Sequence, residues 1–103
     1  MAILPTIEEQ ISASNKALRV KILSPRQELL NTQAFAVSSI NSAGPFDVLT
    51  EHGNFITLVQ NKQITIRLLN NKVLTYIFPL TVIYARKNLV TIFTDIQLEL
   101  LTS

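Results

Sequence analysis

The stretch Leu18-Arg19-Val20-Lys21-Ile22 alternates strictly between apolar and basic side chains. Successive side chains of a strand point to opposite faces of a sheet, so the three apolar residues are expected on a buried face and the two basic residues in water. Ser24-Pro25-Arg26 ends this pattern, because Pro25 has no amide hydrogen to donate to a ladder. The stretch therefore predicts a half-buried strand followed by a turn.

Segments with a similar β character follow along the rest of the chain. They are short, rich in β-branched and aromatic residues, and separated by turn residues. Asn70-Asn71 indicates a two-residue hairpin, because asparagine tolerates positive φ, and Arg86-Lys87-Asn88 indicates a second tight hairpin. The predicted strands are residues 18–22, 27–30, 34–40, 46–49, 54–60, 63–69, 72–78, 81–85 and 89–96.

About nine short strands with no long helix between them predict an all-β fold, a β-sandwich or a small barrel. The strands are expected to be mainly antiparallel, since parallel strands need crossover helices. With 103 residues the chain is expected to form one domain, residues 18–96. Residues 1–17 form a leader, for which a capping box at Thr6-Ile7-Glu8-Glu9 indicates a short helical turn and a loosely ordered segment is the alternative. Residues 97–103 form a tail.

The composition predicts a packed core and excludes several functions. Apolar residues make up 48% of the chain and charged residues 16%. The absence of cysteine excludes disulfides and thiolate chemistry and fits a reducing compartment, so the cytoplasm is the default location. The net charge is +2 and the basic residues are scattered, which does not favour nucleic-acid binding. The longest uncharged stretch, residues 73–85, is too short for a membrane-spanning helix.

No catalytic, cofactor or metal site is predicted. His52 is the one histidine, which excludes multi-histidine metal sites, and no serine lies in a nucleophile elbow. Two glycines are too few for a phosphate-binding loop or a dinucleotide fingerprint, so no small-molecule substrate is expected. The aromatic residues in apolar runs are expected to fill the core rather than stack on bases, and they include Phe35, Phe46, Phe55 and Phe93.

The segment Ser42-Ala43-Gly44-Pro45-Phe46-Asp47-Val48-Leu49-Thr50-Glu51-His52-Gly53-Asn54-Phe55 resembles the hallmark loop of the epsilon subunit of F-type ATP synthases, called delta in mitochondria. The residues that match the family in order and spacing are Gly44, Phe46, Asp47, Val48, Leu49 and His52. The run Leu89-Val90-Thr91-Ile92-Phe93-Thr94-Asp95 looks like the last strand of that family. The resemblance covers residues 18 to about 96.

The resemblance implies a β-sandwich in the rotating central stalk of a proton-translocating ATP synthase. Such a subunit is non-catalytic, needs no cofactor, packs on the gamma subunit and rests on the membrane-embedded c ring. It would be peripheral to the cytoplasmic face of the inner membrane and soluble when isolated. Carried over residue by residue, the expected c-ring contacts are Ala43, Gly44, Pro45 and Phe46. The expected gamma contacts are His52, Phe55 and Thr57.

The chain departs from the family pattern at three places. The usual Pro-Gly before the histidine is Thr50-Glu51, so this turn lacks both a fixed proline φ and a flexible glycine. A small Ser-Gly-Gly between two later strands is replaced by the bulkier Phe78-Pro79-Leu80. The sequence ends at Ser103 without the C-terminal helical hairpin of many members, so inhibition by that hairpin is not expected.

Two other functions stay open from the sequence. One is a free-standing β-sandwich or barrel adaptor that binds another protein or single-stranded nucleic acid. The other is a small hydrolase built around His52, which no surrounding motif favours.

Overall fold

The computed structural model describes residues 17–51 and 53–95, and within these ranges the protein is all-β. The leader before residue 17 and the tail from residue 97 lie outside the described residues, so the proposed domain limits stay a prediction. The described strands, in chain order, are β1 (Leu18–Leu23), β2 (Glu28–Asn41), β3 (Gly44–Val48), β4 (Phe55–Gln60), β5 (Gln63–Leu68), β6 (Val73–Ile77), β7 (Leu80–Arg86) and β8 (Leu89–Thr94).

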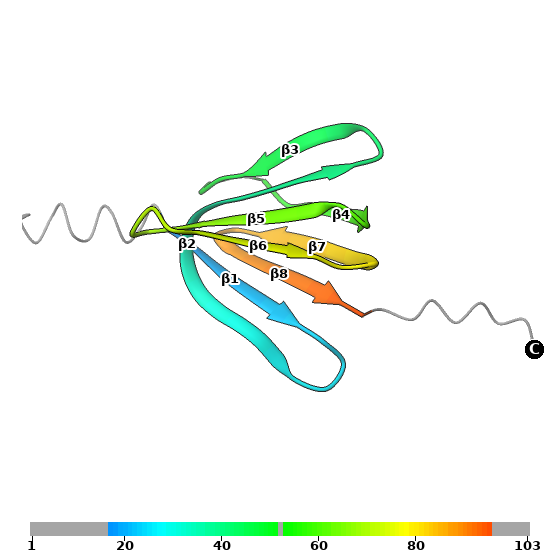
Figure 1. Ribbon diagram of the computed structural model, residues 1–103. Helices are drawn as coiled ribbons and strands as arrows, with labels where there is room; N and C mark the ends of the chain where they lie inside the picture. The colour runs from blue at the N-terminus through cyan, green and yellow to red at the C-terminus, as the bar shows by residue number, and fades with distance from the viewer. Residues whose placement is uncertain (1–16, 52, 96–103) are drawn as a thin grey trace, which may run out of the picture.

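The strands form two packed layers that share β2. They are hydrogen-bonded in the order β4-β7-β8-β1-β2-β5-β6, and β3 pairs with the far half of β2. Figure 1 shows β2 bending sharply, so that its first half lies beside β1 and its second half continues into the other layer. We call β4-β7-β8-β1 with the first half of β2 the first sheet, and β3, the second half of β2, β5 and β6 the second sheet. The predicted sandwich is confirmed, and its described pairs are antiparallel except β1 with β8.

The long bent strand β2 replaces two predicted strands, which were wrongly separated between residues 30 and 34. The polar run Asn31-Thr32-Gln33 stays extended because it pairs with β1, where Val20 lies opposite Thr32. The register with β5 shifts between Ala34 and Ala36, and an irregularity of this kind bends a strand. The described chain therefore has eight strands rather than nine.

The core lies between the two sheets and is almost entirely aliphatic. The buried face predicted for β1 is confirmed, since Leu18, Val20 and Ile22 are each 0% exposed. Of the two basic residues expected in water, Arg19 is exposed and Lys21 is half-buried. The other buried core residues are Ala34, Val37, Val48, Val59, Ile64, Ile66, Ile83, Ala85, Val90 and Ile92. Branched aliphatic side chains from both sheets thus interdigitate, as expected for a sandwich.

Two buried threonines break this apolar pattern. Thr81 on β7 lies directly opposite Thr94 on β8, and their exposures are 0% and 1%. Neither hydroxyl oxygen has a hydrogen-bond partner. A buried hydroxyl without a partner destabilises a folded protein by roughly 1–3 kcal/mol. This pair is therefore a weak point of the core.

Replacing Thr81 by valine is expected to raise the free energy of unfolding by about 1 kcal/mol, because a methyl group of similar size replaces an unpaired hydroxyl. Urea denaturation measures this as a higher midpoint at an unchanged slope. Thr57→Val is the matched control. The Thr57 hydroxyl accepts a hydrogen bond from Asn41 Nδ2 at 3.0 Å, so the same substitution should lower stability there. Equal shifts in both variants would contradict the explanation.

The two predicted hairpins are present. Lys87 and Asn88 join β7 to β8, with Arg86 opposite Leu89. β5 ends at Leu68 and β6 begins at Val73, so each strand is one residue shorter at the turn than predicted. The turn between them is therefore longer than two residues. Asn71 adopts the expected positive φ, 67°, and its N–H donates to the Leu68 carbonyl at 3.0 Å.

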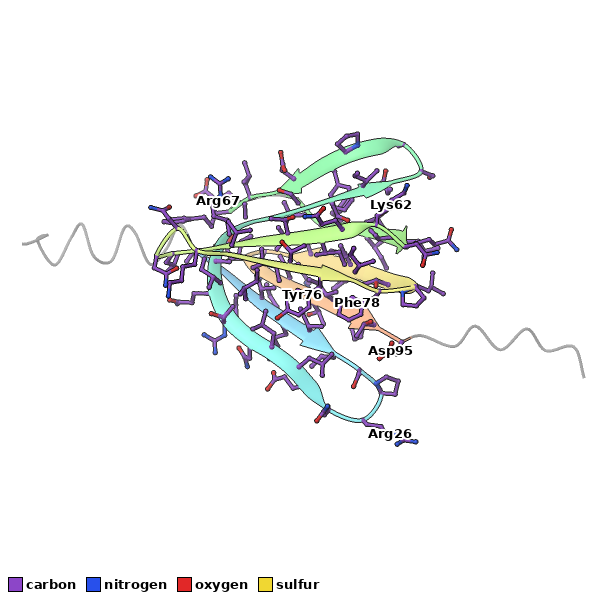
Figure 2. The ribbon with its side chains drawn as sticks, in the orientation of Figure 1. Arg26, Lys62, Arg67, Tyr76, Phe78 and Asp95 are labelled. Carbon is purple, nitrogen blue, oxygen red and sulfur yellow. The ribbon has the colours of Figure 1, made fainter. Side chains whose placement is uncertain are left out.

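The connections gather at the two ends of the sandwich. The turns after β1, β2, β4 and β6 lie at one end, on the right in Figure 1, which we call the turn end. Figure 2 shows Arg26 and Lys62 on two of these turns and Asp95 near the same end, whereas Arg67 lies towards the other end. Among the described residues, no helix is long and apolar enough to cross a membrane.

Candidate functional site

The turn between β2 and β3 lies at the turn end and is held in place by side-chain hydrogen bonds. The Asn41 side chain holds it, because Oδ1 accepts the Ala43 N–H at 2.9 Å while Nδ2 donates to the Thr57 hydroxyl on β4. Gly44 follows with φ of +123°, a conformation that side-chain-bearing residues rarely adopt. Of the predicted c-ring residues, Ala43 lies in this turn, whereas the next three begin β3. The turn is therefore tied to both sheets.

Two predicted contact residues touch each other. The rings of Phe46 on β3 and Phe55 on β4 are 5.3 Å apart between centroids and tilted by 54°, and both pack against the core. This contact closes the side of the sandwich where β3 and β4 are the edge strands. The structure thus brings together one residue expected to face the c ring and one expected to face gamma. Both rings are half-buried.

The turn after β3 contains a residue in the left-handed conformation at the position where the family pattern has glycine. Glu51 has φ of +63°, and its N–H donates to the Asn88 side-chain oxygen at 2.9 Å. A non-glycine residue in this conformation costs about 1 kcal/mol. His52 lies outside the described residues, so its predicted role stays a prediction. The departure at Thr50-Glu51 is accommodated by backbone strain and one bond to the β7–β8 turn.

Glu51→Gly is expected to stabilise the domain by about 0.5–1 kcal/mol, since glycine relieves the strain at positive φ. Thermal unfolding should show a midpoint raised by a few degrees. Glu51→Ala is the control, because it removes the same carboxylate and keeps the strain. A rise in both variants would attribute the gain to the lost charge instead.

The outer face of the first sheet is apolar over β4, β7 and β8, whereas Arg19 of β1 and Asn31 and Gln33 of β2 make the rest of it polar. On β4 the side chains of Ile56 and Leu58 point outward and are 66% and 52% exposed. They lie opposite Tyr84 and Val82 of β7, respectively. On the other side of β7, Phe93 of β8 lies opposite Val82. Leu89 lies on the same face of β8 as Phe93. We call this surface the β4–β7–β8 face; its residues are Ile56, Leu58, Val82, Tyr84, Leu89 and Phe93.

The outer face of the second sheet is mixed, because Val73 and Ile77 of the edge strand β6 are exposed while polar side chains cover β5 and the adjoining part of β2. Thr65 of β5 lies opposite Ser38 on one side and Thr75 on the other. The Ser38 hydroxyl donates to Asp47 of β3, and Arg67 is exposed on β5. The β4–β7–β8 face is a patch of neighbouring apolar side chains, and a contiguous exposed apolar patch usually marks an interaction site. The β4–β7–β8 face is therefore the candidate docking surface.

A groove joins this face to the turn end. It has a volume of about 270 Å³ and lies between the end of β2 and β4. Leu58 belongs both to the groove and to the β4–β7–β8 face, and Lys62 adds a cation. Its lining is Ile40, Asn41, Ser42, Leu58, Gln60 and Lys62. The arrangement suits recognition of a protein. No group of three or more His, Cys, Asp or Glu suited to a metal occurs within 17–51 and 53–95.

Sequence reasoning missed most of the apolar face. Phe35 and Phe93, predicted to fill the core, are 39% and 40% exposed, so that prediction was wrong for these two. Phe46 and Phe55 do pack against the core. The available signal was the lack of alternation in residues 55–59 and 89–93, where apolar side chains fall on both faces of a strand.

A model of a known protein family matches residues 17–99, which is most of the chain. The family is described as "ATP synthase, Delta/Epsilon chain, beta-sandwich domain". The chain belongs to this family. The family is named for the delta or epsilon chain of ATP synthase. No similar sequence was found among curated proteins.

Solved structures share the delta/epsilon fold. A chain of the Euglena gracilis mitochondrial ATP synthase, from a structure of OSCP, F1 and the c ring, superposes with a TM-score of 0.72 at 14% identity, covering 77% of this chain and 51% of that one. A chain of the Tetrahymena thermophila mitochondrial ATP synthase, from its central stalk and c ring, gives a TM-score of 0.63 at 13% identity, covering 75% and 62%. The delta/epsilon domain described here thus spans about half to three fifths of those chains.

Proposed function

We propose that this delta/epsilon chain is a non-catalytic rotor subunit in the central stalk of a proton-translocating ATP synthase, linking the gamma subunit to the c ring by contact. One observation carries the proposal: a domain of this family presents an apolar outer face beside a rigid turn. Two adjoining surfaces of different character suit two different partners. The two-layer sandwich supplies stiffness, because packed sheets resist shear and can transmit torque.

The gamma subunit docks on the β4–β7–β8 face. Of the residues first expected there, Phe55 and Thr57 are half-buried, and Thr57 is bonded to Asn41. Their neighbours Ile56 and Leu58 point outward and offer gamma more apolar area. His52 follows Glu51 in the sequence and is proposed to take part in the gamma contact. Burial of exposed aliphatic and aromatic side chains is the usual source of binding energy in such interfaces.

The c ring lies against the turn end. Ala43 and Pro45 are exposed, whereas Gly44 and Phe46 are partly covered, so the first two make the direct contact. Arg26 and Lys62 lie on neighbouring turns and add positive charge. The subunit is then peripheral to the cytoplasmic face of the inner membrane, is soluble when isolated, and binds neither nucleic acid nor a cofactor.

Co-elution tests the proposal. The purified chain, mixed at micromolar concentration with the gamma subunit of its own organism, is expected to elute as one complex in gel filtration. The complex should then bind detergent-solubilised c ring, which the chain alone binds more weakly because one contact is missing. Separate elution of the chain and gamma at every concentration tested would overturn the assignment.

A further inference from the structure

The free edge of β6 has the chemistry of an unfilled strand-pairing site. β6 is the last strand of the sheet order, and among the described strands it pairs only with β5. The Leu68 N–H donates to the Lys72 carbonyl at 2.8 Å, which fixes the alternation of the ladder. Leu74 and Tyr76 then direct their backbone groups to β5. Those of Val73, Thr75 and Ile77 point to the open edge.

This edge lacks the features that usually keep edge strands from pairing. Its register with β5 is unbroken from Gln63–Ile77 to Arg67–Val73, so no bulge twists it away. β6 itself contains neither a charged residue nor a proline, and Val73 and Ile77 are 49% and 66% exposed. Charged residues, prolines and bulges are the common safeguards.

The three other edges among the described strands differ from that of β6. The first half of β2, an edge of the first sheet, carries the charged Glu28. β3 contains Pro45 and Asp47, which remove one donor and add a charge. β4 contains neither a charged residue nor a proline, but the end of β2 lies against it, where Asn41 bonds the Thr57 hydroxyl. The unprotected edge among the described strands is therefore that of β6.

We propose that the free chain forms a two-fold dimer in which β6 pairs antiparallel with β6 of a second copy, centred on Thr75. The strand Val73-Leu74-Thr75-Tyr76-Ile77 is self-complementary in this register. Each Val73 faces an Ile77, each Leu74 faces a Tyr76, and the two Thr75 residues face each other. Apolar pairs and Thr–Thr pairs across strands stabilise a sheet. An isologous contact of this kind closes at two copies.

Neighbouring side chains support the same register. On the outer face, Arg67 lies beside Val73 and Gln63 lies beside Ile77. In the proposed dimer the row of side chains across the sheet therefore runs from Arg67 and Val73 of one copy to Ile77 and the uncharged Gln63 of the other. Shifting the register between the two β6 strands by two residues would place Thr75 opposite Val73 or Ile77, and the apolar and Thr–Thr pairs would be lost. The two Thr65 and two Thr75 residues would form one continuous row. No like charges meet in the proposed register.

The dimer concerns the chain outside the stalk and uses neither the β4–β7–β8 face nor the β2–β3 turn. Its test is independent of the gamma experiment. Light scattering coupled to gel filtration of the full chain should show the mass rising with concentration from 11.5 kDa towards twice that value. Thr75→Pro should remain monomeric over the same range. Its N–H points to the open edge, so proline removes no bond to β5.

Thr75→Val is the matched control, since it keeps the N–H and should still dimerise. Ile77→Lys is a second disrupting variant that keeps the backbone intact, and it should also be monomeric if Thr75→Pro does not fold. A wild-type chain that is monomeric throughout would overturn the proposal. Dimerisation that survives both disrupting variants would overturn it too. Loss of gamma binding in Thr75→Pro, with a monomeric wild type, would assign the edge to a strand of gamma instead.

Discussion

Replacing Ile56 by aspartate is expected to weaken binding of the gamma subunit at least about 30-fold, a loss of roughly 2 kcal/mol. Ile56 is 66% exposed on the edge strand β4 of the proposed contact, opposite Tyr84 of β7. A carboxylate placed there must lose its hydration without gaining a partner, and the apolar contact disappears as well. Isothermal titration of the purified chain with gamma measures the change in Kd.

Gln63→Asp provides the control for Ile56→Asp. It adds the same charge on the outer face of the second sheet, where Gln63 is exposed. Binding of gamma should be unchanged in this variant. Both substitutions lie at the surface, so each should alter the free energy of unfolding by no more than about 0.5 kcal/mol. Equal binding losses in the two variants would point to a general charge effect and remove gamma from the β4–β7–β8 face.

Strands were predictable where one face of the sheet is buried and the other is exposed to solvent. In β1 the alternation of apolar and basic residues determined both the strand and its buried face, and Ile22 is 0% exposed as expected. Turn residues supplied the second signal, since Asn71 adopts positive φ. Both signals are local, and local signals do not depend on the rest of the fold.

The bend in β2 was not predictable by the same means. Polar residues at 31–33 look like a turn in the sequence, but they belong to a continuous strand in which Asn31 and Gln33 are exposed and Thr32 is half-buried. The strand stays extended because β1 and β5 lie on its two sides at different points. Such pairing is between residues distant in sequence, which no local pattern reports.

The sequence located the segment expected to contact gamma but not which of its side chains point outward, and the contact itself stays a proposal. The family resemblance pointed to the segment around Phe55 and Thr57, which lies on β4. Side chains alternate along a strand, so the outward residues are their neighbours Ile56 and Leu58. The sequence alone does not distinguish an apolar side chain that fills the core from one that lies on an exposed interaction surface. The exposed side of such a strand becomes evident once both sheets are in place.

Ile22→Ala is expected to lower the free energy of unfolding by about 2–5 kcal/mol, because it removes buried methyl groups and leaves a cavity. Ile22 is fully buried, pairs with Leu30 of β2 and Ile92 of β8, and so lies where the first sheet packs on the core. A small domain is stabilised by about 5–15 kcal/mol in total, so this one change removes a large fraction. Urea denaturation should show a much lower midpoint with the slope unchanged.

The same substitution at Ile77 separates burial from residue type. Ile77 is 66% exposed on the edge strand β6, so at concentrations where the chain is monomeric Ile77→Ala should cost no more than about 0.5 kcal/mol. If the buried and the exposed isoleucine gave equal losses, the core would not lie between the sheets at Ile22. If the Ile22 variant still binds gamma when folded at low temperature, its loss is one of stability alone. That result is expected, because Ile22 points away from the β4–β7–β8 face and into the core.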